Sequence, residues 1–183
     1  LLSISSTPSE NFILVKEFLQ STFPKGKQVV ISNYTQGALM SALAGISLIR
    51  DFSKPIVVDL VDILFNSNID PIKIFRANKN ITGIIPFFQS ENPKFSYLEL
   101  DKNENVVKTK EKEVISNNAS AGVYFFKNIA AFLQATSYSI NHCMELAYNN
   151  LLFLCPAFNG LINEENLVKA VAVTDQREIS LKF

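Results

Sequence analysis

QVVISNYTQGALMSALAGISLIRDFSKPIVVDL, residues 28–60, contains the pattern that indicates the fold class of this chain. Two short runs rich in β-branched residues, 29–32 and 55–60, are typical of buried strands. Between them, apolar side chains recur at helical spacing, which predicts a helix with one apolar face; they are Ala38, Leu39, Ala42, Leu43, Ile46 and Ile49. The alternation of strand, helix and strand predicts a parallel sheet with a right-handed crossover and helices on its faces.

The sequence on either side continues this mixed pattern. Residues 95–111 alternate apolar and polar side chains around the turn-rich segment DKNEN, which predicts a protruding β-hairpin near residues 95–110. Further buried strands are expected at 11–16, 81–88, 121–126, 151–158 and 167–174, and helical segments at 159–166 and, as two pieces, within 128–150. We therefore predict a single three-layer α/β domain over residues 1–183, with a mixed, mostly parallel sheet.

Composition and charge narrow the classes of function. The chain has 183 residues, 48% hydrophobic and 19% charged, so it can bury a sizeable core and is not a disordered chain. Its 17 basic and 17 acidic residues balance, so we expect neither nucleic acid nor a membrane surface as a partner. We find no targeting leader and no apolar run of membrane-spanning length. Cys143 and Cys155 lack redox or metal spacing, which favours a reduced, cytoplasmic protein.

One histidine limits the available chemistry. His142 stands between Asn141 and Cys143 in a helical stretch, where a partly buried structural histidine is the commoner case, so hydrolase triads are set aside. One histidine and two cysteines cannot supply the four ligands of a structural zinc site.

Asp59 and Asp62 form the best metal candidate. They follow a predicted strand, at the place where open α/β sheets bind ligands. Mg²⁺ keeps most of its water and needs only one or two carboxylates together with substrate phosphates. The spacing agrees equally well with a second interpretation, in which one of these aspartates caps a helix that starts at Ile63.

Gln36 and Gly37 lie at the junction between a predicted strand and the predicted helix. Glycine lets the backbone approach a flat ligand, and a carboxamide can pair with the edge of a base. The commoner role for such a segment is a helix cap, with Thr35 as the N-cap residue. In the same way, the ordinary interpretation of Glu111 and Lys112 is a solvated arm of the hairpin.

Taken in chain order, several stretches resemble the sugar nucleotidyltransferases, particularly the branch of bacterial capsule and surface-polysaccharide synthesis. The resemblance covers about residues 11–173 and is most specific at 95–126; its stretches are TQGALMSAL (35–43), the strand that ends in Asp, ENPKFSYLELDKNENVVKTKEKEVISNNASAGVYFFKN (91–128) and FLCPAFNGLI (153–162). The family has a GT-A-type α/β fold. It transfers a nucleotidyl group from an NTP to a phosphorylated acceptor with Mg²⁺ and releases pyrophosphate.

The resemblance implies roles for the nucleotide and the metal. Gln36 and Gly37 match the segment that contacts the base, so they are expected to bind the nucleotide. Asp62 matches the aspartate that holds Mg²⁺ on the triphosphate.

The resemblance also implies an acceptor site. Ser96, Glu111 and Lys112 match positions that line it, and Lys112 is placed to meet the charge of a phosphate. On this interpretation the Glu-Lys pair and the Asn-Ala-Ser turn at 118–120 form the rim of the acceptor pocket, and the strand GVYFF holds that rim in place.

Departures from the family pattern leave two hypotheses. The Gly-rich loop, the Arg and the Pro-Lys with which the family binds phosphates have no counterpart here, and Leu60, Ile63 and Leu151 stand where polar residues or a carboxylate are usual. The chain is either an N-terminally incomplete enzyme or a degenerate domain that binds a ligand or serves in assembly, and the apolar replacements favour the second. If the first strand of the family is absent, an exposed sheet edge would allow two chains to form a homodimer.

Overall fold

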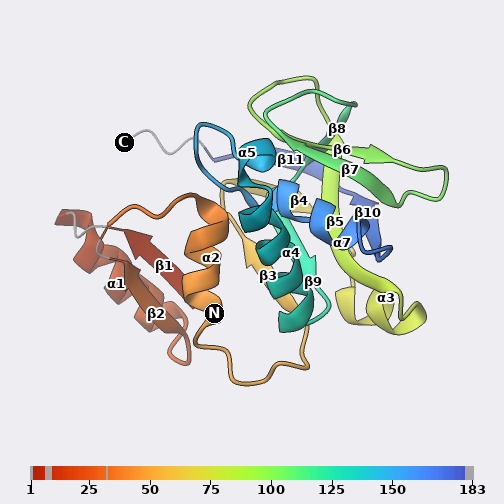
Figure 1. Cartoon of the computed structure of the whole chain (residues 1–183). Helices are drawn as coiled ribbons and strands as arrows, with labels where there is room; N and C mark the ends of the chain where they lie inside the picture. The colour runs from red at the N-terminus through yellow and green to blue at the C-terminus, as the bar shows by residue number, and fades with distance from the viewer. Residues whose placement is uncertain (1, 7–9, 32, 180–183) are drawn as a thin grey trace. The chain divides into compact units, whose positions relative to one another are not determined.

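The computed structural model describes residues 2–6, 10–31 and 33–179, and the chain divides into two compact units, residues 1–50 and 51–183 (Figure 1). The first unit consists of β1 (Leu2–Ser6), α1 (Glu10–Thr22), β2 (Lys27–Ile31) and α2 (Ala38–Ile46). Strands β1 and β2 pair in parallel, so α1 connects two parallel neighbours in the manner expected of an α/β fold. The prediction of a single domain stays a prediction.

Helix α2 confirms the apolar stripe, whereas α1 contradicts the strand predicted at 11–16. The buried residues of α2 are Leu39, Ala42, Gly45 and Ile46, and the helix ends before Ile49. The run at 11–16 lies inside α1 because the segment continues to a helical length of 13 residues. A short apolar run fits a strand and a helix equally well, so its length decides between the two.

The second unit contains the main sheet. Its seven strands follow the order β3-β9-β5-β8-β6-β7, with β10 beside β5, and β11 pairs separately with β4. In chain order the elements are β3 (Ile56–Asp59), β4 (Ile63–Asn66), α3 (Pro71–Ala77), β5 (Ile81–Gln89), β6 (Ser96–Leu100), β7 (Val106–Glu111), β8 (Asn118–Ser120), β9 (Val123–Phe126), α4 (Ile129–Asn141), α5 (Cys143–Leu146), α6 (Leu154–Ala157), α7 (Asn159–Ile162), β10 (Leu167–Ala172) and β11 (Thr174–Glu178).

The sheet is mostly antiparallel, so the prediction of a mostly parallel sheet is wrong. Strands β3, β5, β6, β7, β8 and β9 all pair antiparallel with one another, and β10 with β5 is the parallel pair in the described part of this sheet. Parallel neighbours need a long crossover, which α4 to α7 supply before β10, whereas the strands from β6 to β9 follow one another after short connections. Strand β2 of the first unit pairs with β1, and β3 of the second unit pairs antiparallel with β9. The three-layer arrangement stays a prediction.

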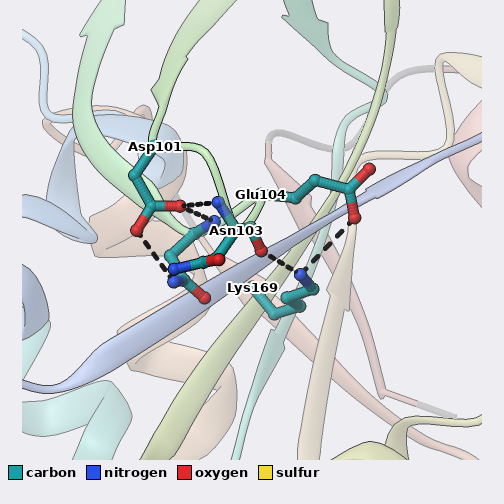
Figure 2. Close-up of polar contacts among 5 residues, drawn as sticks. Asp101, Asn103, Glu104 and Lys169 are labelled. Carbon is teal, nitrogen blue, oxygen red and sulfur yellow. Dashed lines mark hydrogen bonds and ion pairs between the residues drawn. The ribbon is translucent and has the colours of Figure 1, made fainter.

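The predicted hairpin is confirmed as β6 and β7, but it is built into the sheet. Ser96 lies opposite Glu111, while β6 pairs with β8 on its other side, and Tyr97 and Leu98 have no exposed surface. Figure 2 shows how its turn is held: Asp101 accepts a hydrogen bond from the backbone N–H of Asn103, and Lys169 of β10 donates to the carbonyl of Asn103 and pairs with Glu104. Tyr97 and Leu98 are consecutive, so β6 has buried side chains on both of its faces, as a strand inside a sheet does.

The segment 151–158 is not a strand, as was predicted, but contains the buried helix α6. Pro156 lies in its middle, and proline cannot donate to a sheet ladder. A short helix with apolar residues on every side is buried on every side. Its sequence therefore looks the same as that of a buried core strand. It leads into Phe158, which has no exposed surface and stacks on Phe126 with ring centroids 4.6 Å apart. The other elements predicted beyond residue 80 are confirmed.

In the part of the chain that the structure describes, none of the helices has both the length and the apolar character needed to cross a membrane.

Candidate functional site

A small pocket opens beside strand β7. It measures about 100 Å³ and is lined by Lys110, Glu111, Glu113, Glu145, Leu146, Ala147, Tyr148 and Pro156. Pockets that enclose a whole small molecule are usually about 300–1,000 Å³, so this one can receive only one edge of a ligand. Its lysine is already engaged, because Lys110 pairs with Glu113 at 3.6 Å. The pocket therefore presents mainly carboxylate oxygens, which accept hydrogen bonds from ligand hydroxyl or amino groups.

Glu111 is the half-buried carboxylate of this pocket, and Ser96 holds it. The two residues face each other across the β6–β7 ladder, and the Ser96 hydroxyl donates a 2.5 Å hydrogen bond to Oε2 of Glu111. Partial burial raises the pKa of Glu111, while the Ser96 hydrogen bond and the charge of Lys112 act in the opposite direction. The hairpin thus brings together Ser96, Glu111 and Lys112, the three residues that the resemblance assigned to an acceptor site. The expectation of a turn at 118–120 on the rim is wrong, because Asn118–Ser120 form strand β8 and are not part of the pocket lining.

Behind Glu111 lies a buried polar cluster on β8, β9 and α6. The Ser120 hydroxyl donates to the Tyr124 hydroxyl at 3.0 Å, and neither side chain is exposed by more than 3%. Burial raises the pKa of Tyr124, and the nearby Cys155 and Glu111 raise it further; burial also raises the pKa of the Cys155 thiol. Both groups therefore stay neutral near pH 7, and the strand that contains GVYFF supports the pocket with uncharged side chains.

Lys112 lies next to this pocket, and its side chain is held by aromatic rings. Its Nζ is 5.0 Å from the ring centre of Tyr148 and 5.6 Å from that of Phe153. Its backbone adopts a positive φ of 51°, and its N–H donates to the carbonyl of Phe95 at 3.1 Å. Sequence reasoning missed Tyr148 and Phe153, because the first lies in a stretch interpreted as helix and the second in a stretch interpreted as a core strand.

Asp62 lies in the connection between β3 and β4. Strand β4 begins at Ile63, so neither aspartate caps a helix there, and that interpretation is wrong. Asp59 instead accepts a 2.8 Å hydrogen bond from the N–H of Val61, whose φ is 56°. Partial burial raises the pKa of Asp62, and the charges of Glu178 and Asp59 raise it further. Its side chain nevertheless remains exposed to solvent.

Gly122 makes room for the Asp62 carboxylate. It joins β8 to β9 at a φ of 75°, and a Cβ added to it would lie 2.9 Å from Oδ1 of Asp62. The same residue accepts a 3.0 Å hydrogen bond from the N–H of Leu60, so the two loops are held together. The Gly of GVYFF therefore sets where Asp62 stands, and a side chain at this position would displace it.

We expect Gly122→Ala to destabilise the protein by about 1–2 kcal/mol, the usual cost of a Cβ in the left-handed region. Urea unfolding followed by circular dichroism measures this loss. In an Asp62→Ala background the carboxylate no longer opposes the added Cβ, so part of the loss should disappear while the backbone part remains. Strictly additive effects of the two substitutions would show that the contact between Asp62 and residue 122 has no energetic weight.

The donor set around Asp62 fits Mg²⁺ as a partial site. Among the described residues, no group of three or more His, Cys, Asp or Glu side chains could hold a metal ion. An exposed aspartate with Asp59 close enough to raise its pKa still offers the one or two carboxylates that Mg²⁺ needs when phosphates complete its shell. The residues therefore fit a metal held jointly with a phosphorylated substrate.

Gln36 and Gly37 lie in the first unit. Gly37 is the N-cap residue of α2 at a φ of 105°, and its carbonyl accepts hydrogen bonds from the N–H groups of Met40 and Ser41, each at 3.1 Å. Thr35 is not the cap: its hydroxyl donates to the Gly37 carbonyl at 2.9 Å. A positive φ explains why glycine stands here. Gln36 is exposed, and its role at a base stays a prediction.

His142 and a groove beside α3 are not assigned to the binding of an acceptor, a nucleotide or a metal. His142 stacks on Tyr138 with ring centres 4.0 Å apart and contacts its carbonyl through Nδ1 at 3.0 Å, which is a structural role at the end of α4. A groove of about 740 Å³ runs between α3 and β10, and its Asp70 is already the cap of α3, bonded to the N–H of Lys73 at 3.0 Å. This groove is larger than the pocket at Glu111, but it contains none of the residues assigned from the sequence.

Comparison with known proteins shows the fold. No protein-family model and no curated protein matches the chain. A nucleoside-diphosphate-sugar pyrophosphorylase from Vibrio cholerae RC9 matches with a TM-score of 0.81 and 20% identity, over 97% of this chain and 75% of that one. A Bacillus anthracis protein assigned as a glucose-1-phosphate thymidylyltransferase, solved with a sucrose, matches with a TM-score of 0.67 and 16% identity, over 96% and 69% of the two chains. The chain therefore has a sugar-nucleotidyltransferase-like fold, which confirms that part of the prediction.

Proposed function

We propose that this chain binds a small phosphorylated acceptor, such as a sugar phosphate, for nucleotidyl transfer from an NTP in the synthesis of capsule or surface polysaccharide. The observation that carries the proposal is the Ser96–Glu111 pair beside Lys112, at a pocket on a fold similar to that of a nucleoside-diphosphate-sugar pyrophosphorylase. We place the reaction in the cytoplasm, as the sequence predicts.

Different residues would bind the hydroxyl groups and the phosphate of the acceptor. Glu111, held by Ser96, accepts hydrogen bonds from hydroxyl groups of the acceptor. Lys112 supplies the positive charge for the acceptor phosphate. Because the pocket holds about 100 Å³, it takes the hydroxyl-bearing edge of the acceptor, while the phosphate lies outside it next to Lys112.

The reaction itself needs positioning and charge neutralisation more than covalent chemistry. An oxygen of the acceptor phosphate forms a new bond to the α-phosphorus of the NTP, and the bond from that phosphorus to the bridging oxygen of the β-phosphate breaks, which releases pyrophosphate. Asp62 would hold Mg²⁺ together with the phosphates, and the metal would neutralise their charge. Gln36 and Gly37 would contact the base.

Isothermal titration of the protein with glucose 1-phosphate, followed by a pyrophosphate-release assay with each common NTP and Mg²⁺, tests the proposal. We expect binding that depends on Ser96: the Ser96→Ala variant should bind several-fold more weakly, because Glu111 loses its hydrogen bond. The proposal would be contradicted if the wild-type protein bound none of three sugar phosphates: glucose 1-phosphate, mannose 1-phosphate and glucosamine 1-phosphate.

Millimolar Mg²⁺ and NTP together should raise the melting temperature of the wild-type protein and leave that of Asp62→Asn unchanged. A ligand at about five times its Kd stabilises a protein by about 1 kcal/mol, which for a chain of this size is about 2–4 °C. Differential scanning fluorimetry measures the shift. Asp51→Asn, which changes an exposed aspartate of the same unit, is the matched control and should keep the shift.

A second candidate function is a non-catalytic module that binds a ligand or serves in assembly. The specific observations that favour it are the apolar Leu60 and Ile63 on either side of the Asp62 loop and the lack of a three-ligand cluster among the described residues. This function predicts that Mg²⁺ and NTP leave the melting temperature of the wild-type protein unchanged, whereas a sugar phosphate still binds.

A further inference from the structure

Two aromatic side chains surround the Lys112 ammonium, and both are fixed by local structure. Tyr148 and Leu151 exchange two backbone hydrogen bonds of 3.0 Å across Asn149 and Asn150, whose φ values of 50° and 61° are those of a type I′ turn. Asparagine tolerates this left-handed conformation, so two consecutive asparagines favour a turn at this position. Phe153 comes two residues after Leu151 and is the N-cap residue of the buried helix α6. The two rings meet at 71° with centres 6.4 Å apart.

The carboxylates of the pocket would otherwise attract this ammonium. Glu111, Glu113 and Glu145 line the pocket next to Lys112, and Lys112 lies near enough to Glu111 to lower its pKa. Within the described ranges, however, Lys112 forms no ion pair, whereas its neighbour Lys110 pairs with Glu113. The faces of the two rings, which attract cations, hold Lys112 in place of a carboxylate.

We propose that Tyr148 and Phe153 are positioning residues that keep the Lys112 ammonium away from the pocket carboxylates and available to an anionic group of the ligand. The inference rests on the proposed function, since it gives Lys112 the phosphate of the acceptor to bind. The contact with the rings leaves the ammonium positive and only partly desolvated, whereas an ion pair with a glutamate would cancel its charge. An acceptor that lacks the phosphate would gain nothing from the two rings.

The first measurement locates the lysine without any ligand. In a protein labelled with ¹³C at its lysines, the ε-methylene signal of Lys112, assigned with the Lys112→Gln variant, should be shifted upfield by the ring currents. The shift should be lost in the double variant Tyr148→Leu/Phe153→Leu and kept in Tyr148→Phe, which retains both rings. An unshifted Lys112 signal in the wild-type protein would overturn the inference, whatever the protein binds.

The second measurement titrates the same proteins with glucose 1-phosphate and with methyl glucoside, which has no phosphate. The double leucine variant should bind glucose 1-phosphate about two- to fivefold more weakly for each ring that is lost, whereas methyl glucoside should bind both proteins alike. Tyr148→Phe retains both rings and should bind glucose 1-phosphate more tightly than the double leucine variant. Equal affinity of the leucine variant and the wild type for glucose 1-phosphate would overturn the inference. A shifted Lys112 signal in a protein that does not bind glucose 1-phosphate would mean that the proposed function fails at this site. The contact between Lys112 and the two rings would then be real, but the proposal that it prepares Lys112 for a ligand would be overturned.

Discussion

Glu111→Gln should weaken the binding of glucose 1-phosphate by about 10- to 100-fold and leave the fold intact. Hydrogen bonds to a charged group contribute about 1.5–3 kcal/mol, and each 1.4 kcal/mol is a factor of ten in Kd. Glutamine keeps the shape and one carbonyl oxygen for Ser96, but it loses the charge that strengthens hydrogen bonds from ligand hydroxyl groups. Isothermal titration at pH 7.5 measures the change in Kd.

The matched control is Glu99→Gln, which changes an exposed glutamate on the same hairpin and should alter the Kd by less than about twofold. If Glu111→Gln bound glucose 1-phosphate as tightly as the wild type, the acceptor could not rest on this carboxylate, and the proposed site would be wrong.

The same substitution has a pH signature in stability. The pKa of Glu111 is raised in the folded protein, so between its usual value and the raised value the folded state binds more protons than the unfolded chain. Stability from this group therefore falls as the pH rises through that window. Glutamine cannot titrate, so the free energy of unfolding of Glu111→Gln, relative to the wild type, should improve from acidic to neutral pH. Urea unfolding at a series of pH values measures this difference.

Phe158→Ala should cost about 3–5 kcal/mol of stability, the range for deleting a fully buried aromatic side chain. Its ring has no exposed surface. It stacks on the ring of Phe126 with centroids 4.6 Å apart, and its centroid lies 5.8 Å from that of the Tyr124 ring. Natural domains are stable by only about 5–15 kcal/mol, so the variant should unfold at a much lower urea concentration. Because Tyr124 belongs to the cluster behind Glu111, the variant should also bind glucose 1-phosphate more weakly.

Phe52→Ala is the matched control for this loss, since the Phe52 side chain is 62% exposed and its removal should change stability by no more than about 0.5 kcal/mol. A loss below about 1 kcal/mol for Phe158→Ala would mean that the aromatic stack is not part of a tightly packed core.

The hairpin shows what the sequence can and cannot reveal about the site. Alternation around a turn predicts that Ser96 and Glu111 face each other, and the β6–β7 register confirms that they do. Nothing in the local pattern shows that Tyr148 would reach Lys112, because this contact depends on how the turn that follows α5 folds back on the hairpin. The closeness of Gly122 and Asp62 has the same cause, since it joins two loops far apart in the sequence.

The errors in the fold have a common physical cause. The segments at 11–16 and 151–158 are short and apolar, and such segments satisfy the burial requirement of a strand or of a helix. The prediction of strand direction failed for another reason: direction depends on which strands become neighbours, and β3 pairs antiparallel with β9, more than sixty residues later. Local spacing carries no information about such distant partners.

The two walls of the pocket beside β7 are made at different times during synthesis of the chain. Lys110 and Glu111 emerge from the ribosome well before Tyr148 and Pro156, which form the opposite wall. The hairpin can form early because its two strands are adjacent in the sequence, but Lys169 secures its turn only after β10 has been made. A nascent chain that stops before Pro156 therefore has an unshielded Glu111 and lacks one wall of the pocket, so binding at this pocket requires the chain to have been made as far as Pro156.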